Sequence, residues 1–399
     1  MDRTSGHPPL SRDIYAFSAL FFLIFMGAGA QQAYLVRYLE RTMDWSSAAC
    51  GGVIACVYMS MFFFRVGNLF LFKQWTDRTF TIVGAFSYLV FCLGMASVPM
   101  TGSYTFALAC AILWGMGAAM MWAGTTMQIL RLGDRAGGRH GTGMGILYSS
   151  TQAGWLVGAV LLGVVYKSLS VDQLPWLYGL AAAITLAGNL VSFLLPKGER
   201  AARDAPSLSS MLAVMARRPA QIASTLQFLS ALGYGLILGT FAKYIENAHG
   251  AGWVWISISL YPATRMVLSF VGGRMTDRVG YAPVLVSGFL AGSLGLVAAV
   301  LWQNPYACVG STLALALLSS TVPVAAATIV GETAERKRRP LEYGVLFSWR
   351  DLGVATAAFG SNVLGKKFPM ETVFCVFAAL FLGCAILAAV LGRMRHQTS

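Results

Sequence analysis

The chain has 399 residues, of which 57% are hydrophobic and 11% charged, and its net charge is +13. Soluble globular domains carry about 25% charged residues, so this composition excludes an ordinary soluble protein and indicates a polytopic membrane protein. The 7 cysteines lie in apolar runs without a C-x-x-C pair, and the 4 histidines fall in tails or loops. The sequence therefore predicts no metal site and no cofactor.

Apolar runs follow one another along the chain, each long enough to cross a hydrocarbon layer about 30 Å thick as a helix. The first run is not followed by a small-residue cleavage site, so we expect it to remain as the first span. The twelve predicted spans are 14–38, 47–72, 79–98, 104–130, 143–166, 176–195, 221–244, 252–272, 282–302, 306–330, 343–364 and 371–391. They predict an all-α polytopic fold.

Lys and Arg gather in alternate connections, for example at 131–139 and 336–339, and near both ends of the chain. Because basic residues concentrate on the cytoplasmic side of membrane proteins, we expect both termini to be cytoplasmic. The positive charge then reflects topology and contacts with the lipid bilayer, and no nucleic-acid partner is needed to explain it. We expect a multi-pass protein of the cell inner (cytoplasmic) membrane.

The longest polar stretch divides the chain near its middle. It predicts an N-terminal six-helix lobe at 1–195, a cytoplasmic linker at 196–220 with a short amphipathic helix at 207–217, and a C-terminal six-helix lobe at 221–399.

The two halves repeat. Arg65 and the pair at 77–78 recur 200 residues later as Arg265 and the pair at 277–278. Six spans separate the copies, so both have the same orientation, as in lobes related by a pseudo-two-fold axis along the membrane normal.

The segment GRMTDRVG at 273–280 resembles the GxxxDRxG loop of the major facilitator superfamily. The copy after the second span keeps the Asp-Arg pair but lacks both glycines. The resemblance implies a two-lobed secondary transporter with alternating access, and loops that hold the halves together when the cytoplasmic side is closed. The predicted gating residues are Asp77, Arg78, Gly273, Asp277, Arg278 and Gly280.

The fifth span contains Gly145, Gly154, Gly158 and Gly163, which resembles the glycine pattern of exporters in that family. The proline expected after the third glycine is Ala159, so the pattern favours export only weakly. Close helix packing explains the same glycines equally well.

Charged residues inside the spans are the main functional signal. Arg65 and Arg265 each precede an Asp-Arg pair by twelve residues, which at about 1.5 Å per residue places them near the membrane midplane. Arg350 and Asp351 reach a similar depth in the eleventh span. A charge at this depth costs roughly 2.5–3.5 kcal/mol and needs a reason. We expect Arg65 and Arg265 to face each other across the central cavity that these spans line in the resembled family.

Three guanidiniums against one carboxylate leave a net positive charge, and planar charged forks suit carboxylate or phosphate groups. We therefore predict an anionic small-molecule substrate, with Asp351 as the candidate proton-coupling residue. The predicted substrate-binding residues are Arg65, Arg265, Arg350, Gln31, Gln152 and Tyr34. An alternative stays open, in which the arginines bond carbonyls or pair with Asp351 and only lock helices together.

The sequence thus predicts a monomeric secondary transporter of a small organic anion, such as a carboxylate metabolite, a siderophore or an acidic antibiotic, with a weak preference for export. Efflux of amphipathic drugs with structural arginines, and a receptor of the same fold that no longer transports, are the alternatives. No P-loop and no HExxH motif is found, so no enzyme is predicted.

Overall fold

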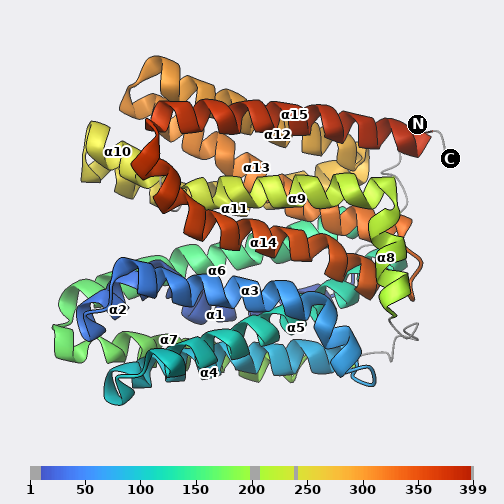
Figure 1. The fold of residues 1–399 in the computed structure, drawn as a ribbon. Coiled ribbons are helices and arrows are strands. Elements are labelled where there is room, and N and C mark those ends of the chain that lie inside the picture. The colour runs from blue at the N-terminus through green and yellow to red at the C-terminus, as the bar shows by residue number, and fades with distance from the viewer. Residues whose placement is uncertain (1–9, 198–206, 238–240, 397–399) are drawn as a thin grey trace. The chain divides into compact units, whose positions relative to one another are not determined.

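A computed structural model describes residues 10–197, 207–237 and 241–396 (Figure 1). Over these residues the regular secondary structure consists of helices joined by turns and short loops. The helices of the N-terminal half are α1 (Asp13–Ile24), η1 (Phe25–Gly29), α2 (Gln32–Met43), α3 (Ser47–Leu71), α4 (Asp77–Thr101), α5 (Tyr104–Arg135), α6 (His140–Ser168), η2 (Val171–Gln173) and α7 (Pro175–Ser192).

The C-terminal half begins with a short helix, α8, which confirms the helix predicted at 207–217. Its helices are α8 (Leu208–Ala216), α9 (Arg218–Leu236), α10 (Ala242–His249), α11 (Ala251–Val279), α12 (Tyr281–Trp302), α13 (Pro305–Thr333), α14 (Arg339–Lys367) and α15 (Met370–His396). Each of the twelve predicted spans coincides with one of these helices or with consecutive ones, so the all-α fold class is confirmed. Residues 198–206 of the predicted linker lie outside the described residues.

Within the described part of the chain, nine helical segments are long and apolar enough to cross a membrane. The spans predicted at 221–244, 252–272 and 343–364, which fall on α9 and α10, on α11 and on α14, are not among them. Two of these three carry predicted functional charges, Arg265 on α11 and the 350–351 pair on α14, whereas α3, which carries Arg65, is among the nine.

The chain folds into two compact units. One consists of residues 11–129 and 150–205, and in it α7 packs against α4, α1 and η1. A bond across this packing runs from the Ala28 backbone N–H to Thr185 Oγ1, at 3.0 Å. It satisfies a backbone donor of the π-helical turn η1, which interrupts the first span.

The other unit consists of residues 1–10, 130–149 and 206–399. In it α12 packs against α13 and α15, α9 against α14, and α11 against α13 (Figure 1). The last turn of α5, the following loop and the first turns of α6 belong to this unit, although they come from the N-terminal half of the sequence.

Candidate functional site

Arg265 lies in the middle of α11 and is 5% exposed. Its guanidinium carbon lies 5.5 Å from the ring centroid of Tyr234 on α9 and 5.4 Å from that of Tyr261 on α11. The two ring centroids are 6.2 Å apart, so the three groups form a nearly equilateral triangle. The guanidinium therefore rests against the tyrosine pair and is not sandwiched between the rings, an arrangement in which cation–π attraction stabilises the buried charge.

The hydrogen bonds of Arg265 leave part of its donor capacity unused. Its Nη2 donates to the backbone oxygen of Ser319 on α13 at 3.3 Å, and the hydroxyl of Tyr261 donates to Ser319 Oγ at 2.7 Å. The Nε of Arg265 is buried and has no hydrogen-bond partner among the described residues. A buried donor without a partner carries a desolvation penalty of about 1–3 kcal/mol, which a ligand can relieve.

Arg350 and Asp351 lie together on α14. The Arg350 Nη1 is 3.5 Å from Asp351 Oδ1, with the arginine side chain 23% exposed and the aspartate fully buried. Neighbouring residues point about 100° apart on a helix, and the long arginine side chain turns back to span that angle. Arg350 and Arg265 both lie close enough to the hydroxyls of Tyr234 and Tyr261 to interact with them electrostatically, so one unit brings these charges into a single cluster.

The remaining predicted binding residues belong to the other unit. Arg65 is buried in α3, at 2% exposure. Gln31 donates through Nε2 to the Ala28 oxygen at 2.9 Å, and the Oε1 atoms of Gln31 and Gln152 have no hydrogen-bond partner among the described residues. The Tyr34 hydroxyl donates to the Ala159 oxygen at 2.5 Å and so joins α2 to α6. That Arg65 faces Arg265 stays a prediction.

The glycines of α6 permit close helix approach. A Cβ at Gly154 or Gly158 would collide with the backbone oxygen of Phe22 or Met26, and one at Gly163 would meet the Tyr34 hydroxyl. The packing explanation therefore accounts for these positions without reference to transport direction.

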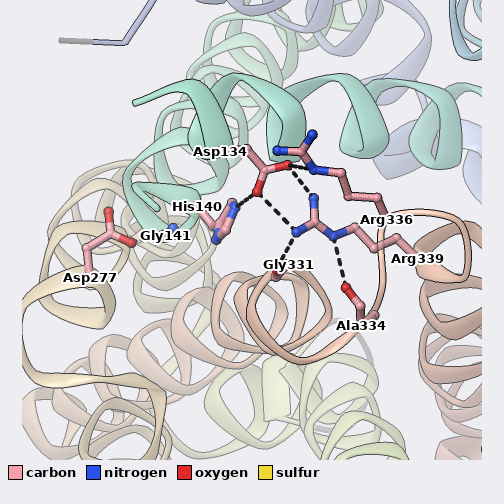
Figure 2. Close-up of polar contacts among 8 residues, drawn as sticks. All are labelled: Asp134, His140, Gly141, Asp277, Gly331, Ala334, Arg336 and Arg339. Carbon is pink, nitrogen blue, oxygen red and sulfur yellow. Dashed lines mark hydrogen bonds and ion pairs between the residues drawn. The ribbon is translucent and has the colours of Figure 1, made fainter. Parts of the chain in front are cut away.

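A polar cluster joins the ends of α5 and α6 to those of α13 and α14 (Figure 2). The carboxylate of Asp134 accepts bonds from Arg339 Nη1 at 2.7 Å and Nη2 at 3.1 Å, and Arg336 Nε lies 3.3 Å away. His140 Nε2 lies 2.8 Å from the same carboxylate. Arg339 also donates to the backbone oxygens of Gly331 and Ala334. A bidentate arginine and several further donors make this carboxylate a strong link.

Asp277, at the end of α11, caps the beginning of α6. Its Oδ1 accepts from the Gly141 N–H at 2.7 Å and its Oδ2 from the Thr142 N–H at 2.6 Å. Both donors are in the first turn of the helix, where backbone N–H groups lack helical partners and the helix dipole favours a negative charge. Arg278 is exposed, and Gly280 has a φ of 85°, in the region that favours glycine.

The first-half copy of this loop is built differently. Asp77 is the first residue of α4 and is fully buried, and Thr76 caps the helix by accepting from the Thr79 N–H at 3.1 Å. Arg78 Nη2 donates to the Phe193 oxygen at 2.9 Å.

Sequence reasoning missed Asp134, His140 and Arg339. It assigned the histidine to a loop, whereas His140 is the first residue of α6 and only 4% exposed. It assigned the basic residues at 336–339 to topology alone. One available signal was Asp134 itself, an acidic residue in an otherwise basic connection.

Replacing Gly273 with alanine should destabilise the unit by about 1–3 kcal/mol, because the new methyl group would overlap the Gly141 backbone oxygen and lie 2.8 Å from the Gly145 Cα. Thermal unfolding in detergent measures the change. Gly272→Ala is the matched control, since its Cβ would make an ordinary contact with Thr321 Cγ2 at 3.4 Å. Equal stability of the two variants would contradict close packing of α11 on α6.

Comparisons with known proteins agree with this architecture. The family model described as Major Facilitator Superfamily matches residues 223–399. The Tetracycline resistance protein, class E, of Escherichia coli is 25% identical over 193 residues, which cover 45% of this chain and 44% of that protein. The match thus spans less than half of the relative's length.

Solved structures share the fold over nearly the whole chain. The transporter FucP in an outward conformation, described in another structure as the E. coli fucose:proton symporter, superposes with a TM-score of 0.76 at 17% identity, covering 95% of this chain and 98% of that one. The human organic anion transporter MFSD10 superposes with a TM-score of 0.73 at 15% identity, covering 96% of this chain and 100% of that one. The family model thus matches the C-terminal half of this multi-pass membrane protein, and the helical fold of the described residues is that of major facilitator superfamily transporters.

Proposed function

We propose that this protein is a secondary transporter that moves a small organic anion by alternating access and binds its charged group at Arg265. The observation that carries the proposal is the buried Nε of Arg265, a charged donor without a partner among the described residues. A carboxylate bound there would supply the missing acceptor and neutralise the charge.

The charge of the cluster supports an anion over a cation. Arg265 and Arg350 contribute two positive charges, against one negative charge from Asp351. Arg350 already lies beside that carboxylate, whereas the acceptor of Arg265 on Ser319 is an uncharged carbonyl. The hydrogen bond from Arg265 to the Ser319 carbonyl is what a purely structural arginine would also make. However, this bond uses only one of the three guanidinium nitrogens of Arg265.

Gln227 on α9 extends the candidate site. Its side chain is 1% exposed, and neither Oε1 nor Nε2 has a hydrogen-bond partner among the described residues. It precedes Tyr234 by seven residues, two helical turns, and so lies on the same face of α9 about 10 Å away along the axis. An anion that also carries a neutral hydrogen-bonding group would satisfy both Arg265 and Gln227.

Asp351 is the proposed coupling residue. Protonation of its carboxylate would remove the negative charge beside Arg350 and so increase the net positive charge that the cluster presents to an anion. We further propose that both termini are cytoplasmic and that the protein acts as a monomer in the cytoplasmic membrane, with export as the favoured direction.

Purified protein reconstituted in vesicles tests the function. We expect it to exchange at least one radiolabelled organic anion from a panel of succinate, citrate and benzoate, and to do so only when the anion is present on both sides or a pH gradient is imposed. Binding without flux would indicate a receptor. Neither binding nor flux with any organic anion, in a preparation that is folded by circular dichroism, would contradict the proposal.

A second candidate function is efflux of amphipathic drugs, favoured by the 25% identity to a tetracycline resistance protein. The same vesicles distinguish the two candidates. Movement of tetracycline or of a cationic dye that survives Arg265→Gln would support drug efflux with a structural arginine.

A further inference from the structure

We infer that Pro323 positions Arg265 for anion binding by leaving the Ser319 carbonyl free to hold the guanidinium. This inference rests on the proposed function of Arg265. Pro323 lies inside α13, which spans Pro305–Thr333. It needs no contact with the substrate, so it is a positioning residue.

The backbone pattern of an α-helix explains the effect. The N–H of each residue donates to the carbonyl four residues earlier, and proline has no N–H to donate. The carbonyl four residues before Pro323 belongs to Ser319, which therefore lacks its usual helical donor. Arg265 Nη2 donates to this oxygen at 3.3 Å.

The other unit contains the same arrangement. Pro99 lies inside α4, and the carbonyl four residues earlier belongs to Met95. The fully buried Tyr38 donates its hydroxyl to that oxygen at 2.7 Å. In both units a buried donor from a neighbouring helix thus takes the carbonyl that a proline leaves free, as buried backbone groups require.

Ser319 holds the tyrosine side of the site as well. Its hydroxyl accepts from Tyr261 at 2.7 Å and donates to the Leu315 oxygen at 2.8 Å. One residue therefore fixes both the guanidinium and a ring against which the guanidinium packs. With Nη2 committed to the carbonyl, the Nε–H keeps a fixed direction, and an anion meets a donor that is already oriented.

Pro323→Ala tests the inference. The new N–H would compete for the Ser319 carbonyl, so Arg265 would lose its acceptor and its fixed orientation. We expect about five- to tenfold weaker binding of whichever of succinate, citrate or benzoate the wild type binds best, measured by isothermal titration calorimetry. The variant should fold, because alanine is favoured over proline inside a helix.

Pro99→Ala is the matched control, since it removes an equivalent proline in the other unit and leaves Arg265 untouched. We expect its affinity to stay within about twofold of wild type. In an Arg265→Gln background, Pro323→Ala should change the affinity no further, because its effect passes through the guanidinium. An equal loss of affinity in both backgrounds, or none in either, would overturn the inference.

A structure of the Pro323→Ala protein supplies a test without any ligand. We expect the backbone N–H that the variant gains at this position to bond the Ser319 oxygen and the Arg265 guanidinium to leave it. An unmoved guanidinium would refute the positioning role even if anions bind. Failure of the wild type to bind any organic anion would instead refute the proposed function, so the two failures are distinguishable.

Discussion

Arg265→Gln should weaken binding of the transported anion by about tenfold to a hundredfold. The glutamine amide retains hydrogen-bond donors but loses the charge, and a hydrogen bond to a charged group is worth about 1.5–3 kcal/mol. The substrate carboxylate would then be desolvated without a counter-charge. Calorimetric titration of the purified protein, with the anion that the wild type exchanges, measures the change.

Arg274→Gln is the control for this prediction. Arg274 lies on the same helix but is exposed, with its guanidinium carbon 5.2 Å from the Phe270 ring centroid. Its replacement should leave affinity unchanged. Arg265→Lys should give an intermediate loss, because a lysine keeps the charge but not the planar fork. Full affinity in Arg265→Gln would show that the arginine only joins α11 to α13.

Much of the fold could be predicted from the sequence because each span must satisfy its own backbone in lipid. Length and apolar content suffice to locate such helices, and even α14 was recognised across its charged pair. The break in the first span was not predicted, because the π-helical turn at 25–29 depends on packing against α7.

The candidate site was predictable only in part. The depth of Arg265 could be predicted, because the arginine and the Asp-Arg pair that marks the end of the span lie on one helix at a known spacing. Its two tyrosine contacts and the Ser319 carbonyl depend on how α9, α11 and α13 pack, which no local pattern specifies. The four-residue offset between Pro323 and Ser319 is visible in the sequence. That Arg265 donates to the Ser319 carbonyl could be learned only from the structure.

The polar cluster at the helix ends illustrates the limit more sharply. Asp134 and Arg339 are 205 residues apart in sequence and come from different halves of the chain. A single sequence contains nothing that pairs them. Local context instead suggested two independent basic connections, so the predicted gating residues included Asp277 but not this pair.

Asp134→Asn should destabilise the unit formed by residues 130–149 and 206–399 by about 3–5 kcal/mol. Arg339 is 7% exposed and binds the Asp134 carboxylate through two nitrogens, and the variant would remove that negative charge. Breaking a buried ion pair is costly because the remaining charge stays buried without a counter-charge. His140 would lose a charged partner in the same step. Unfolding in detergent, followed by tryptophan fluorescence, measures the free energy.

Glu335→Gln is the matched control, because it also removes a carboxylate from this region. Glu335 is 76% exposed and its oxygen lies 3.9 Å from Arg338 Nε, so the exposed pair should contribute little. A large loss for Asp134→Asn beside a negligible one for Glu335→Gln would show that the buried bidentate geometry, and not local charge, ties the ends of α5 and α6 to α14. Equal small losses would mean that α6 is held instead by the Asp277 cap and the glycine contacts, which Gly273→Ala tests independently.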